Sequence, residues 1–181
     1  MNERALIDLF VTEFGKLKKQ ADRAAVQVEG DDFSRLLDPE ANSIATLMKH
    51  LAGNMRSRWT DFLTTDGEKS TRERDEEFEL RDADSREEII AAWEDGWKRV
   101  LGAISALEPS DLEKSINIRG EPHSVPQAIL RQLTHYAAHV GQIVMLAKHW
   151  AGSEWKTLSI PRGKSKEFEV SKRGETYEPK S

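Results

Sequence analysis

The chain has 181 residues, a length that predicts a single domain able to bury a sizeable core. It contains no cysteine, which excludes disulfides, thiolate metal ligands and a cysteine nucleophile. The net charge of −5 argues against a nucleic-acid partner. Neither a signal-peptide pattern nor an apolar run of the roughly 20 residues that span a bilayer is present, so we expect a cytoplasmic protein with no membrane association.

Four segments carry apolar residues at helical spacing. We expect helices at about residues 3–26, 43–62, 85–107 and 125–150. The last three begin at residues that favour helix starts, namely Asn42 or Ser43, Ser85 with Glu88, and Ser124 with Pro126. Four amphipathic helices predict an all-α fold, a four-helix bundle formed by residues 1–160.

The segments between the helices differ in composition. Residues 63–84 are polar and mostly acidic, which predicts a long, solvated crossover between the second and third helices rather than a binding segment. Residues 114–125 alternate like a short hairpin, with Gly120 at the turn before the fourth helix. Residues 161–181 predict a polar C-terminal tail that is partly disordered.

The fourth predicted helix carries a polar stripe where a bundle normally places leucine or isoleucine. At about 100° per residue, Gln132, His135, His139 and Gln142 fall on one line. The neighbouring stripe is apolar and includes Tyr136, so the two histidines lie close to the apolar face rather than opposite it. Because a buried polar side chain is costly without a partner, this stripe predicts a specific polar function.

The two histidines of this stripe lie one helical turn apart, so their rings can converge on one metal ion. His50, in the middle of the second predicted helix, is the candidate third ligand, although a lone histidine there is more often a satisfied core residue. Three neutral imidazoles leave coordination positions for water or substrate. His149 lies about 15 Å beyond His139 along the helix, and His123 precedes the helix, so we predict that neither binds the metal.

The stretches "MKHLAGNM", "HYAAHVGQI" and "WKTLSIPRGKS" resemble an uncharacterised bacterial branch of the DinB-like superfamily. This superfamily includes the bacillithiol S-transferases and the mycothiol-dependent maleylpyruvate isomerases, and the resemblance spans about residues 1–150. It implies an antiparallel bundle, a divalent metal site formed by His50, His135 and His139, and frequent homodimers.

The leading functional hypothesis is transfer of a low-molecular-weight thiol to an electrophilic small molecule. A divalent cation on three neutral imidazoles, whether zinc, nickel or iron, would lower the pKa of a bound thiol toward neutrality. Gln132 and Gln142 are expected to bond a ligand imidazole or the substrate, or else each other, and Asn54 is a further candidate. Arg162 and Lys164 in the tail either pair with a carboxylate of the thiol or are solvated.

Two alternatives belong to other functional classes. A metal-dependent hydrolase needs a general base, and no carboxylate lies on the polar stripe. A non-enzymatic, dimeric stress-response or binding protein would hold its metal structurally, but structural zinc usually has four protein ligands. No catalytic residue is assigned from the sequence.

Overall fold

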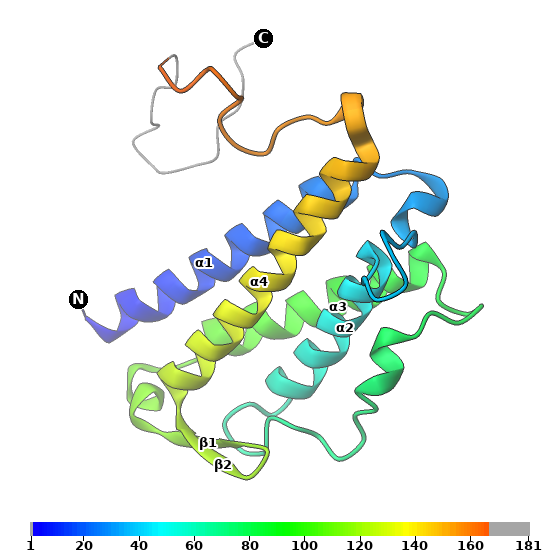
Figure 1. The fold of residues 1–181 in the computed structure, drawn as a ribbon. Helices are drawn as coiled ribbons and strands as arrows, with labels where there is room; N and C mark the ends of the chain where they lie inside the picture. Colours follow the sequence, from blue (N-terminus) through cyan, green and yellow to red (C-terminus); the bar gives the residue numbers. More distant parts are fainter. Residues whose placement is uncertain (1, 167–181) are drawn as a thin grey trace.

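The computed structural model describes residues 2–166, which form four α-helices and one small antiparallel sheet (Figure 1). The helices are α1 (Glu3–Ala25), α2 (Ile44–Trp59), α3 (Arg86–Ser105) and α4 (Val125–Ala151). The sheet pairs β1 (Ser115–Ile118) with β2 (Glu121–Ser124), and a short 3₁₀ turn, η2 (Asp75–Phe78), lies between α2 and α3. The prediction of a mostly helical fold with a short hairpin before the last helix is confirmed.

Side-chain caps start the last three helices where the sequence predicts them. The hydroxyl of Ser43 accepts a hydrogen bond from Thr46 N at 3.1 Å, and that of Ser85 accepts one from Glu88 N at 3.2 Å. Ser124 forms a capping box: its hydroxyl accepts a hydrogen bond from Gln127 N, and its own backbone N–H donates to the Gln127 side chain. These caps satisfy backbone donors that have no partner inside the helix.

Helix α2 ends three residues earlier than its apolar pattern predicts, at Trp59 instead of Phe62. Thr60 has an extended backbone, with ψ at 124°, and Asp61 has a positive φ of 48°. Neither conformation continues an α-helix. Phe62 nevertheless remains buried, and its ring lies 4.8 Å from that of Trp59.

The core lies between the four helices and is rich in aromatic side chains. Helix α2 contacts α3 and α4, and α1 contacts the same two helices. Phe14, Trp97 and Tyr136 are fully buried and meet edge to face, with ring centroids 5.8–6.4 Å apart. Such rings bury a large apolar area in defined orientations, so they fix α4 against its neighbours.

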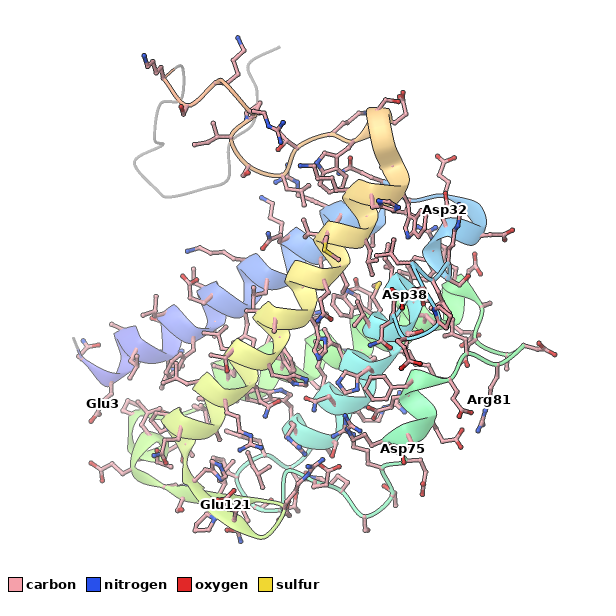
Figure 2. All side chains as sticks on the ribbon, in the orientation of Figure 1. Glu3, Asp32, Asp38, Asp75, Arg81 and Glu121 are labelled. Carbon is pink, nitrogen blue, oxygen red and sulfur yellow. The ribbon has the colours of Figure 1, made fainter. Side chains whose placement is uncertain are left out.

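The crossover between α2 and α3 is docked on the protein in part, which corrects the prediction of a solvated loop. Gly67 N donates to Asn117 O of β1 at 2.8 Å, and the carboxylate of Asp66 accepts from the backbone N–H of Arg119 and Gly120 in the hairpin turn. The η2 turn, marked by the labelled Asp75 in Figure 2, contacts α2. Many acidic side chains of residues 63–84 are exposed to solvent, which explains the acidic composition of this segment, whereas Glu77 is buried.

The chain beyond α4 leaves at the end of that helix far from the hairpin (Figure 1). Gly152, with φ at 52°, ends the helix, and Lys156 N then donates to the Gln27 side chain at 2.6 Å beside α1. Leu158 is buried against the core. Residues 167–181, most of the predicted tail, lie outside the described residues. Across residues 2–166, every helix is too short or too polar to cross a membrane.

Candidate metal centre

Three histidines from two helices converge on one point, as the sequence predicts. His135 Nε2 lies 3.1 Å from His139 Nε2 and 3.4 Å from His50 Nε2, and all three ligand atoms lie within 4.8 Å of one another. Three nitrogens about 2.1 Å from one tetrahedral ion would lie roughly 3.4 Å apart. The donor set therefore fits a divalent metal ion.

The other two histidines lie away from this cluster. His123 is on β2, where its Nδ1 lies 2.9 Å from Glu121 O. His149 lies near the end of α4, with its ring 4.5 Å from that of Trp150. Among the described residues, the cluster that could hold a metal ion contains neither of them.

The environment favours the neutral form of the two histidines on α4. Burial lowers the pKa of His135 to about 4, and the neighbouring His139 and His50 add to this effect. Burial also lowers the pKa of His139. Because a metal binds the unprotonated imidazole, both side chains are ready to act as ligands at neutral pH.

A buried carboxylate orients His50. Glu77 Oε2 lies 2.9 Å from His50 Nδ1, and Arg72 holds the same carboxylate with two hydrogen bonds of 2.7 and 2.8 Å. Burial alone would raise the pKa of Glu77, but the bonds from Arg72 and His50 outweigh it and lower the pKa. The ionised carboxylate accepts the Nδ1–H, which leaves the Nε2 lone pair of His50 for a metal.

Glu77 was not predicted from the sequence, because it lies 27 positions from His50 in a polar, acidic segment. The available signal was Phe78, an aromatic residue within that segment. Its ring stacks on the His50 ring, with centroids 4.5 Å apart and planes inclined by 29°. An isolated aromatic side chain in an acidic loop thus marked the point where the crossover packs on α2.

Gly53 provides the space for this carboxylate. It lies on α2, three residues after His50, and a Cβ atom at this position would overlap the Glu77 carboxylate. The absence of a side chain therefore lets the crossover approach the helix backbone closely.

A second buried arginine extends the network. Arg58 donates to Gly67 O and forms an ion pair with Glu68 at 2.7 Å. Arg72 also approaches Glu68 at 3.3 Å, so the two arginines are linked through one carboxylate. The side chains of Arg58 and Arg72 are only 6% and 5% exposed, so these pairs are screened little by solvent.

The predicted polar neighbours of the histidines differ in their roles. Gln142 Oε1 lies 3.0 Å from His139 Nδ1, so it bonds a candidate ligand rather than Gln132. Asn54 Oδ1 accepts from Tyr136 Oη at 3.0 Å and is buried beside the site. Gln132 is 3% exposed, and its Oε1 is buried without a hydrogen-bond partner in the described structure.

A cavity of about 460 Å³ opens beside the three histidines. Asn54 and Gln132 line it, whereas Arg162 and Lys164 lie outside the lining, because the tail leaves α4 at the end far from the hairpin. Of the two alternatives left open for Arg162 and Lys164, contact with a bound thiol therefore stays a prediction. The lining instead contains five arginines: Arg58, Arg72, Arg74, Arg119 and Arg131.

Comparison with known proteins assigns the chain to a family. A model of the family described as "Protein of unknown function (DUF1572)" matches residues 3–164. The chain belongs to the DUF1572 family. DUF1572 is part of the DinB-like clan, which confirms the superfamily that the sequence resembles. No curated protein and no solved structure matches the chain.

We expect the metal-free DUF1572 protein to lose stability as the pH falls from about 6.5 to about 4. In this window the unfolded chain binds a proton at His135, whereas the folded chain does not until the pH approaches about 4. Stability is therefore complete above the unfolded pKa and decreases below it. Thermal unfolding at pH 7, 6 and 5 measures this loss of stability. The loss should be smaller in His135→Gln. Equal melting temperatures of the wild type at the three pH values would contradict the prediction.

Proposed function

We propose that this DUF1572 protein is a metal-dependent enzyme that transfers a low-molecular-weight thiol to an electrophilic small molecule. The observation that carries the proposal is the convergence of three imidazole nitrogens beside an open cavity. A divalent cation held there would supply Lewis-acid chemistry and lower the pKa of a bound thiol toward neutrality. The bacillithiol and mycothiol enzymes that the sequence resembles support this choice.

The side chains of the site prepare it for this role. His50 is oriented by Glu77 and His139 by Gln142, so both present Nε2 to the same point. Neutral imidazoles leave the charge of a cation uncompensated and leave room for an exogenous ligand. The chain has no cysteine that would compete with an external thiol. Imidazole ligands do not distinguish zinc, nickel and iron(II).

The same resemblance supports three further proposals about the molecule. The four helices form the antiparallel bundle of DinB-like proteins, in line with the contacts that α1 and α2 each make with α3 and α4. The protein forms a homodimer, and it acts in the cytoplasm. The bundle is supported by helix packing together with the resemblance. The homodimer and the cytoplasmic location depend on the resemblance and the composition.

Hydrolysis is a weaker candidate for a physical reason. Glu77 is the carboxylate that contacts a candidate ligand, and its oxygens are bonded to His50 and Arg72. It is therefore poorly placed to accept a proton from water. A non-enzymatic, dimeric stress-response protein with a structural metal is the third candidate, but the described residues offer three ligands rather than four.

Consumption of a chloronitrobenzene or an epoxide tests the proposed function. Purified metal-loaded protein is incubated with the electrophile and each of a panel of thiols, and the conjugate is measured. We expect loss of the electrophile that depends on both thiol and protein. Turnover with water alone would replace the proposal with hydrolysis, and no turnover with any thiol would favour a binding protein.

A further inference from the structure

The cavity beside the histidines concentrates positive charge in an acidic protein. The chain carries a net charge of −5, yet five arginines line this one cavity and no aspartate or glutamate of the described residues does. Guanidinium groups match carboxylate and phosphate geometry with paired hydrogen bonds. Solubility alone does not require five arginines to line one concave site.

These arginines outnumber the carboxylates that could neutralise them. Glu68 is shared by three of them, at 2.7 Å from Arg58 and at 3.2–3.3 Å from Arg72 and Arg119. The carboxylate of Glu77 serves both Arg72 and His50. The network behind the cavity wall is therefore short of negative charge.

The arginines at the mouth are the most accessible. Arg131, on the second turn of α4, has its Nη1 3.4 Å from His123 Nε2 and makes no ion pair among the described residues. Arg119 is 55% exposed. Arg74 is 51% exposed, with a 3.6 Å pair to the fully exposed Asp75 and its guanidinium carbon 4.9 Å from the centroid of the Phe78 ring. All three can therefore turn toward a ligand at small cost.

Unpartnered polar atoms at the buried side of the cavity also indicate a ligand. Gln132 Oε1 and Arg58 Nε are both buried without a hydrogen-bond partner in the described structure, and both side chains line the cavity. Buried polar atoms in native proteins are nearly always bonded. A bound molecule that reaches this depth would give Gln132 a donor and Arg58 an acceptor.

We propose that the cavity binds a small molecule that carries at least one anionic group, a carboxylate or a phosphate. The anionic group contacts Arg131, Arg119 and Arg74 at the mouth, and a polar part of the molecule extends to Gln132 beside the histidines. In the proposed reaction, the anionic group belongs to the thiol or to the electrophile. Only this identification of the ligand rests on the proposed function; the anion site itself does not. The positive field also steers such a ligand into the site.

Calorimetry on the full-length protein at low ionic strength tests anion binding without any turnover. Succinate is compared with succinamide, which has a similar shape but no charge, and with inorganic phosphate. We expect succinate or phosphate to bind and succinamide not to bind, and the affinity to fall with added salt. Preference between the two anions identifies the group, whereas equal binding of succinamide, or no anion binding, overturns the proposal.

Matched variants locate the bound anion. Arg131→Gln should weaken anion binding by at least about tenfold, because a charge-assisted contact is lost. Arg35→Gln removes the same charge from an exposed ion pair with Asp32 outside the cavity and should bind like the wild type. Unchanged affinity in Arg131→Gln and Arg74→Gln, with folding confirmed by circular dichroism, would place the anion elsewhere and reject the site.

The two proposals fail separately. Anion binding without thiol turnover would leave the arginine site intact and remove the proposed transferase activity. Turnover with neutral thiols and neutral electrophiles, combined with no anion binding, would support the transferase activity and reject the arginine site.

Discussion

Alanine at His50, His135 or His139 should lower the affinity for a divalent metal ion by at least about tenfold in each case. Each substitution removes one of three nitrogens that lie within 4.8 Å of one another, and two imidazoles hold an ion much less well than three. Elemental analysis of the purified proteins should give about one metal per chain in the wild type. Competition with a chromophoric chelator measures the affinity of each variant.

The remaining histidines supply the controls for this experiment. His123→Ala and His149→Ala alter residues outside the cluster and should retain the metal. Loss of metal in either one, or full occupancy in any of the three ligand variants, would show that the ligand assignment is wrong. Circular dichroism separates loss of the metal from loss of the fold.

Arg72→Met should lower the free energy of unfolding by about 3–5 kcal/mol, the usual cost of removing one partner from a buried ion pair. The substitution preserves much of the side-chain volume but leaves Glu77, which is buried, without its two bonds from the guanidinium. For a protein of this size the melting temperature should fall by roughly 6–20 °C. Chemical denaturation at pH 7 measures the change.

Two further variants test the reason for this loss. Arg74→Met removes a nearby arginine that is 51% exposed and should change stability little. Adding Glu77→Gln to Arg72→Met removes the unpaired charge and should restore part of the stability. If both arginine variants were equally stable, the buried network would contribute nothing, and its role in orienting His50 would be in doubt.

The histidine cluster could be predicted because it depends on local geometry. An i, i+4 pair on an α-helix faces one side whatever the rest of the fold does, and the apolar neighbours of His135 and His139 placed that side near the core. His50 required one further step, since only packing of α2 against α4 brings it to the pair. Its position among buried apolar residues of α2 provided that information.

The network behind His50 could not be predicted for the opposite reason. Arg72 and Glu77 belong to a segment without helical or strand periodicity, so no local pattern places them. Their burial depends on the docking of Gly67 on β1 and of Phe78 on His50, which are contacts between distant parts of the chain. The sequence did not decide between the two alternatives for Arg162 and Lys164, because it does not show the direction in which a chain leaves a helix.

The glycine at position 53 predicts which residue other DUF1572 proteins carry at the same place in their second helix. Even the methyl group of alanine would overlap the Glu77 carboxylate, so the acid would have to shift from its present position beside His50. We expect relatives that retain this pairing to show His-x-x-Gly in their second helix. A relative with a larger residue there must orient its histidine by other means, and that substitution would mark a divergent subgroup.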